Sequence, residues 1–244
     1  MNPLSSFSFG KVIKTFIPGL ILAGAPLLLF DLVYHVSRAP ACPVGHTLWQ
    51  CFIAGSFLRV VVRDSARVTA FGAAVLPLAL MLGFFLNTAL WFCVNNSCRK
   101  RADRAMDKDL LAARTSLETS ALENLRSVLG GKNPGHPQVH LGDFYLPLMD
   151  LEKLTFLRES YFSWFEFQLN SAAAFLLTGA AYIVTVVWMA LAWSLPISWL
   201  STVIVPLAIL VGVVVFLVIA GEKNLRRYQE AFVWFLVGTL RFHD

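Results

Sequence analysis

The sequence predicts an all-α integral membrane protein with four transmembrane helices and a cytoplasmic helical hairpin between the second and third spans. Composition is the first observation behind this prediction. The 244 residues are 57% hydrophobic and 14% charged, whereas soluble domains contain about 25% charged residues. The second observation is a run of 55 residues, 167–221, without Asp, Glu, Lys or Arg. Because a bilayer core takes about 20 apolar residues per helix, this run is long enough for two spans.

Four stretches of the chain are apolar and long enough to cross a bilayer. They cover residues 15–36, 68–98, 169–193 and 199–220. The first two are expected to form an N-terminal two-span hairpin, residues 1–98. The last two, separated by a Leu195-Pro196 turn, are expected to form a C-terminal two-span hairpin with a short cytoplasmic tail, residues 167–244.

The distribution of basic residues predicts that both termini are cytoplasmic. Sixteen of the 20 Lys and Arg residues fall in segments 1–14, 99–166 and 221–244, which this orientation places inside, and cytoplasmic segments carry the excess of Lys and Arg. A juxtamembrane basic cluster directly after the second span consists of Arg99, Lys100, Arg101, Arg104 and Lys108. We expect this cluster to meet anionic lipid headgroups, and we expect the protein to lie in a bacterial inner membrane.

The apolar segment 48–62 is ambiguous. It is 15 residues long and contains Gln50 and Arg59, which is more typical of an interfacial or re-entrant helix than of a span. A fifth span would also place the basic cluster after Cys98 outside, against the charge rule. We therefore expect an amphipathic segment on the outer face.

The insert 99–166 is predicted to be a helical hairpin or stalk without a catalytic fold. Gly130-Gly131 stops its first helix, and a second helix begins near Asp150 and runs into the third span. The first helix repeats apolar residues at near-heptad spacing at Leu110, Leu117, Ala121, Leu125 and Val128. Because the insert carries ten basic and ten acidic residues, it has no net field, and we expect no nucleic acid partner.

Asp31 and His35 are the candidate intramembrane polar pair. They lie four residues apart on one face of the first span, so a carboxylate and an imidazole can share a proton or face a water-filled path. A structural role is the competing interpretation, in which Asp31 reaches toward the outer surface and pairs with His35 or Arg38. Burial of Asp31 against protein favours a scaffold, and exposure on a shared axis favours a pore.

Asn87 and Asn170 form a second candidate pair, near the cytoplasmic ends of the second and third spans. We interpret them as interhelix polar contacts, because amide hydrogen bonds between membrane helices act mainly as packing contacts. Small residues four apart, such as Gly19 with Ala23 and Ala79 with Gly83, let helix backbones approach closely.

The four cysteines divide by side of the membrane. Cys42 and Cys51 fall in the outer loop, where an oxidising compartment favours a disulfide, whereas Cys93 and Cys98 lie at the reducing inner face. Metal binding is not expected, because two cysteines with His46 alone lack the usual zinc-ligand spacing.

These features favour a non-enzymatic protein that acts through helix association, as a scaffold, an immunity-type inhibitor or a defence-type effector. The expected partners are the bilayer and either a second copy or another membrane protein. The alternative is an oligomeric channel or pore lined by Asp31 and His35. An intramembrane enzyme ranks third, because the sequence contains no HExxH motif, no paired acids and no Ser/Lys arrangement. We expect no catalytic residue and no cofactor.

Overall fold

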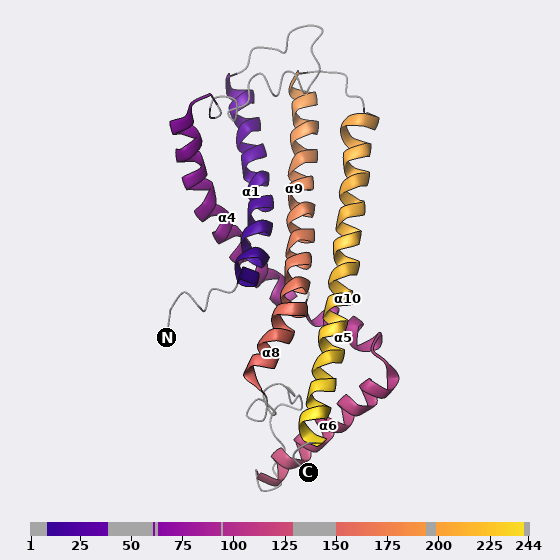
Figure 1. Ribbon diagram of the computed structural model, residues 1–244. Coiled ribbons are helices and arrows are strands. Elements are labelled where there is room, and N and C mark those ends of the chain that lie inside the picture. The colour runs from indigo at the N-terminus through magenta and orange to yellow at the C-terminus, as the bar shows by residue number, and fades with distance from the viewer. Residues whose placement is uncertain are drawn as a thin grey trace. The chain divides into compact units, whose positions relative to one another are not determined.

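A computed structural model describes residues 9–38, 61, 63–93, 95–128, 150–193 and 199–241, and within these ranges every element is a helix (Figure 1). Four helical stretches are long and apolar enough to cross a membrane. They are Ile13–Asp31, Ser65–Trp91, Leu151–Leu191 and Leu200–Gly238. The all-helical class and the four span-length helices predicted from the sequence are therefore confirmed.

The chain divides into two compact units. The first, which we call the spanning unit, comprises Met1–Cys93 and Glu166–Ala220. The second, which we call the polar unit, comprises Val94–Phe165 and Gly221–Asp244. The polar unit thus groups the insert with residues 221–244.

The spanning unit is built around a close contact between α1 (Phe9–Arg38) and α4 (Ser65–Cys93). A Cβ added at Gly19 would lie 1.8 Å from the Ala79 carbonyl oxygen, and one at Gly83 would lie 1.9 Å from the Thr15 carbonyl oxygen. Only glycine allows these backbones to approach so closely. The small residues four apart in the sequence are therefore the contact surface of the two helices.

The third helix of the spanning unit is α9 (Ser163–Trp193), which lies against α1 (Figure 1). A small buried core joins α1, α4 and α9, and it consists of Leu22, Ala25, Leu86, Ala174 and Ala181. The fourth helix, α10 (Val205–Arg241), follows the π-helical turn η4 (Leu200–Ile204). Large apolar side chains stay exposed on the outer faces, for example Phe85 at 72% and Phe216 at 69%, as expected for surfaces that face lipid tails.

The second span is shorter than predicted. The sequence interpretation extended it to Cys98, but α4 ends at Cys93 and a separate helix, α5 (Asn95–Arg104), begins at Asn95. The polar side chains of Asn95, Asn96 and Ser97, which are the first residues of α5, are costly to place in hydrocarbon and so limit the apolar span.

The polar unit contains α5, α6 (Lys108–Val128) and α8 (Leu151–Leu157). The side chain of Asp150 caps α8 by accepting from the backbone N–H groups of Glu152 and Lys153, as an N-cap residue does. The chain then continues through the π-helical turn η3 (Arg158–Phe162) into α9. The helix start near Asp150 agrees with the sequence prediction, whereas Gly130-Gly131, the predicted stop of the first helix, lies outside the described residues.

The C-terminal tail is helical, which the sequence interpretation did not anticipate. Helix α10 continues past Ala220 to Arg241, and it buries Leu225, Val233 and Leu236 to about 1% exposure. A core cluster joins this part of α10 to α6 and α8, and its residues are Leu117, Ala121, Leu154, Phe232, Phe235 and Leu236. The tail and the insert therefore form one packed body.

Candidate functional site

An ion pair inside the spanning unit links α1 to α9. The Lys14 ammonium contacts the Glu166 carboxylate, and the two side chains are only 13% and 9% exposed. Desolvation costs on the order of several kcal/mol per ion, so a buried pair persists only where both partners are held together. Loss of either partner leaves an uncompensated buried charge. The pair therefore ties the position of α1 to that of α9.

Asn170 lies one turn after Glu166 on α9 and is 2% exposed. Its Nδ2 donates to the Lys14 carbonyl oxygen at 3.0 Å and to Asn87 Oδ1 at 2.8 Å. The structure thus brings Asn87 and Asn170 together across α4 and α9, and it adds a third helix, α1, to the contact. One amide group joins three helices by hydrogen bonds, each of which adds about 0.6–2 kcal/mol in a membrane.

Pro18 explains why the Lys14 carbonyl needs an outside donor. Proline has no N–H, so the carbonyl four residues earlier in a helix loses its normal partner. In hydrocarbon such a carbonyl must be paired by another group. The Asn170 amide supplies that donor at 3.0 Å.

The same arrangement occurs near the other end of α9. The Tyr182 hydroxyl donates to the Thr202 carbonyl oxygen at 2.6 Å, and Thr202 lies four residues before Pro206, whose ring removes the usual donor. Between the two sites, Thr178 Oγ1 donates to the Ile21 carbonyl oxygen at 2.9 Å. Helix α9 therefore supplies side-chain donors to backbone carbonyls of the elements on both sides. For the Asn170 and Tyr182 contacts, the signal in the sequence is a proline within one span together with a polar donor within another.

Asp31 lies near the far end of the described part of α1 and is 3% exposed. His35 lies one turn later on the same helix, and its side chain is outside the described part of the structure. The predicted coupling of Asp31 with His35 therefore stays a prediction. Asp31 is buried within a single chain, and this burial bears on the choice between a scaffold and a pore.

The juxtamembrane basic cluster lies in the polar unit, on α5 and at the start of α6. Arg101 pairs with Glu222 of α10 at 3.2 Å, whereas Lys100, Arg104 and Lys108 are exposed. The side chain of Arg99 is outside the described part. Three exposed cations on adjoining turns agree with contact to anionic headgroups, although this partner stays a prediction.

A polar network in the polar unit was not predicted. Arg114 of α6 pairs with both Asp103 and Glu118, and Gln229 Nε2 of α10 donates to Asp103 Oδ1 at 2.7 Å. Burial alone would lower the pKa of Arg114, but the Asp103 and Glu118 carboxylates outweigh it and raise that pKa. The network fastens α5 and α6 to the tail of α10, and its long-range contacts leave no periodic signal in the sequence.

The cysteines are partly described. Cys42 and Cys51, the predicted disulfide, lie outside the described residues. Cys98 is a free, buried thiol in the polar unit. Burial, reinforced by the Glu222 carboxylate, raises the pKa of this thiol, while Arg101 acts in the opposite direction. A raised pKa reduces the thiolate fraction and so makes Cys98 a poor nucleophile.

Within the described residues, no group of three His, Cys, Asp or Glu side chains is arranged to hold a metal ion. The chemistry that the described polar groups carry is ion pairing and hydrogen bonding between helices. These contacts position helices, and they involve neither a nucleophile beside a base nor an oxyanion site.

Comparison with known proteins found no protein-family model, no curated protein and no solved structure that matches this chain.

Proposed function

We propose that this chain is a non-enzymatic multi-pass membrane protein that acts through helix association, as a scaffold, an immunity-type protein or a defence-type effector. We further propose a bacterial inner-membrane location with both termini and the polar unit on the cytoplasmic side. The charge distribution supports this orientation, because sixteen of the 20 basic residues then lie inside. The four span-length helices support the membrane location.

One observation carries the choice of association over conduction. Three ionisable groups on α1 and α9 are buried within one chain. Asp31 is 3% exposed, and the side chains of Lys14 and Glu166 are 13% and 9% exposed. A pore formed between subunits needs such groups on an outer face of each chain, where they line the shared path. Burial against the chain's own helices instead supports a structural role.

The polar unit offers two exposed faces of opposite charge for association between copies. The tail of α10 places Lys223, Arg227 and Trp234 on one helical face, at spacings of four and seven residues. Trp234 is 64% exposed, and neither cation forms an ion pair with a residue that the structure describes. Glu230 on this face is already paired with Arg226 at 2.7 Å, so its charge is largely compensated.

The complementary face lies on the segment that runs from α8 into η3. It places Glu152, Phe156 and Glu159 at spacings of four and three residues, and Phe156 is 68% exposed. This segment and the α10 tail are neighbours in the polar unit, because the rings of Phe162 and Tyr228 lie 5.2 Å apart. Adjacent faces of opposite charge suit a two-fold dimer, in which each face of one copy meets the other face of the second.

Mass measurement by light scattering in a mild detergent tests this proposal. We expect a dimer for the wild type, and we expect charge reversal of one face, Lys223→Glu with Arg227→Glu, to weaken association by at least about tenfold. Reversal of the other face, Glu152→Lys with Glu159→Lys, should weaken it similarly, and the combination of both reversals should restore it. Lys108→Glu, an exposed charge at the start of α6, is the matched control.

Two results would contradict the proposal. A monomeric wild type would contradict these faces as the interface. So would a combined reversal that associates no more strongly than either single reversal. Ion flux in liposomes that Asp31→Asn abolishes without changing the assembled mass would favour the pore.

A further inference from the structure

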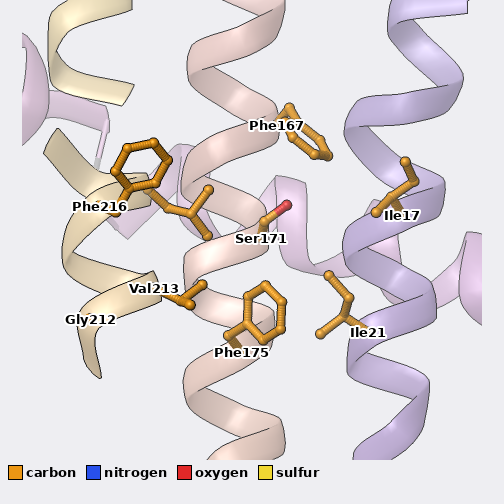
Figure 2. A pocket seen from close by; sticks show the side chains of 9 residues that line it. Ile17, Ile21, Phe167, Ser171, Phe175, Gly212, Val213 and Phe216 are labelled. Atoms are coloured by element: carbon orange, nitrogen blue, oxygen red, sulfur yellow. The ribbon is translucent and has the colours of Figure 1, made fainter. Parts of the chain in front are cut away.

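The spanning unit contains a groove between α1, α9 and α10 with a volume of about 520 Å³. Its lining is almost entirely apolar and includes Ile17, Ile21, Phe167, Phe175, Val213 and Phe216 (Figure 2). The groove lies on helices that are apolar enough to cross a membrane. The molecules that surround such a groove in a bilayer are lipids, and their chains match its lining.

Ser171 is the polar side chain in this lining. It is 2% exposed, and its Oγ has no hydrogen-bond partner among the described residues. A serine within a helix usually bonds to the carbonyl four residues earlier, and Ser171 does not. Figure 2 shows its side chain projecting from α9 toward the α1 side of the groove, between the levels of Phe167 and Phe175. A buried hydroxyl without a partner is costly, and an acceptor delivered through the groove would satisfy it.

The position of Ser171 along α9 indicates which acceptor fits. It lies five residues after Glu166, which is about 7.5 Å along a helix. The Lys14–Glu166 ion pair therefore precedes Ser171, and Phe175 follows it by one turn, while Phe167 lies between the ion pair and Ser171. A diacyl phospholipid has the same order of groups, with a charged headgroup, then ester carbonyls, then acyl chains.

We propose that this groove binds one diacyl phospholipid, with an acyl chain against Phe175 and Val213 and an ester carbonyl accepting a hydrogen bond from Ser171 Oγ. The ester is the recognised group, because the serine supplies a donor at the level where the polar end of the span gives way to hydrocarbon. The groove uses residues of the spanning unit alone, so this proposal does not depend on the association faces of the polar unit.

Competition between ester and ether lipids tests the hydrogen bond. An ether-linked phospholipid of the same headgroup and chain length lacks the carbonyl oxygen and is otherwise nearly identical. Purified protein in mild detergent is incubated with equal amounts of the two lipids, and the bound species are counted by native mass spectrometry. We expect the wild type to prefer the ester lipid by about threefold to tenfold, the range for one neutral hydrogen bond. Ser171→Ala should bind both lipids equally.

Filling the groove tests its occupancy. A Cβ added at Gly212, which lines the groove, meets nothing within 4 Å, so Gly212→Leu places a side chain in the groove without a clash against the chain itself. Gly72 on α4 is the matched control, because a Cβ there also meets open space and it lies outside the lining. We expect Gly212→Leu to reduce the amount of bound lipid at least about tenfold, because the leucine side chain displaces apolar contacts worth about the burial of one Leu side chain. Gly72→Leu should retain the lipid.

Each arm has a result that overturns the proposal. An equal ratio of bound ester lipid to bound ether lipid in the wild type and in Ser171→Ala would contradict the hydrogen bond. Equal lipid retention by Gly212→Leu and Gly72→Leu would show that the lipid binds elsewhere. Thermal unfolding of all variants checks that they are folded, and a variant that unfolds early is replaced by Gly212→Val.

Discussion

Two helix contacts in this protein differ in the size of the residues that form them. Where α1 meets α4 in the spanning unit, glycine brings the backbones so close that an added Cβ would lie within 2 Å of a carbonyl oxygen. Where α6 meets the tail of α10 in the polar unit, the contact is made by large side chains, among them Leu117, Phe232 and Phe235. The polar groups also differ, because the ion pair of the spanning unit is buried and those of the polar unit are mostly half exposed.

The difference follows from the solvent that each region is suited to. Large apolar side chains drive association in water because burial removes them from water. Lipid tails are as apolar as leucine, so this force is absent between spans, and close backbone packing with internal hydrogen bonds replaces it. The comparison predicts that the spanning unit is most sensitive to added volume and to broken polar pairs.

The largest effect is expected from Gly19→Leu. The Cβ alone would lie 1.8 Å from the Ala79 carbonyl oxygen, and backbone cannot move aside as a side chain can. We expect a loss of more than about 4 kcal/mol or failure to fold, seen as a collapse of the thermal transition in detergent. Gly72→Leu on α4 should stay close to wild type, because that position is open. Equal stability of the two variants would contradict the close contact.

Breaking the buried ion pair is expected to rank second. Lys14→Met leaves the Glu166 carboxylate buried without its partner, which should cost about 3–5 kcal/mol. The matched change in the polar unit is Arg101→Met, which breaks a pair whose side chains are 70% and 34% exposed and should cost at most about 1 kcal/mol. Lys14→Met with Glu166→Leu should recover much of the loss. Similar costs for Lys14→Met and Arg101→Met would show that the burial difference has no energetic consequence.

A smaller effect tests the pairing of prolines with donors. Tyr182→Phe removes the hydroxyl that bonds the Thr202 carbonyl and should cost about 1 kcal/mol. In a Pro206→Ala background the alanine N–H can bond this carbonyl, so the same change should cost much less. Thermal unfolding of the four proteins in this cycle gives the coupling directly. Additive costs would mean that the tyrosine does not compensate for the proline.

The smallest effect concerns the reactivity of Cys98. Because burial and Glu222 raise the pKa of its thiol, the thiolate fraction near neutral pH is low, and iodoacetamide should alkylate it more slowly in the folded protein than after unfolding. The rate should rise as the pH approaches the raised pKa. Glu222→Gln removes a raising influence, so it should lower the pKa and speed the reaction at a given pH; Arg101→Met should slow it. Equal rates for all three proteins would contradict the electrostatic part of this account.

Much of the fold could be predicted from local patterns. Apolar run length identified the four spans, because the thickness of a bilayer imposes it on each helix separately. Asp150 marked the start of α8, since a capping side chain acts on the nearest turn. The end of α4 was predicted five residues too late, because a count of charges does not register the uncharged polar side chains of Asn95, Asn96 and Ser97, which are costly to place in hydrocarbon.

The sequence by itself determined which helices form and that small residues and the amides of Asn87 and Asn170 would join them. Only the tertiary structure decided which partners meet: Glu166 with Lys14, Asn170 with the carbonyl that Pro18 frees, and the α10 tail with α6. The physical reason is range. Helix formation depends on neighbours within a few residues, whereas these contacts join residues more than 100 positions apart, and their pairing depends on the rotation and crossing of helices that no single segment encodes.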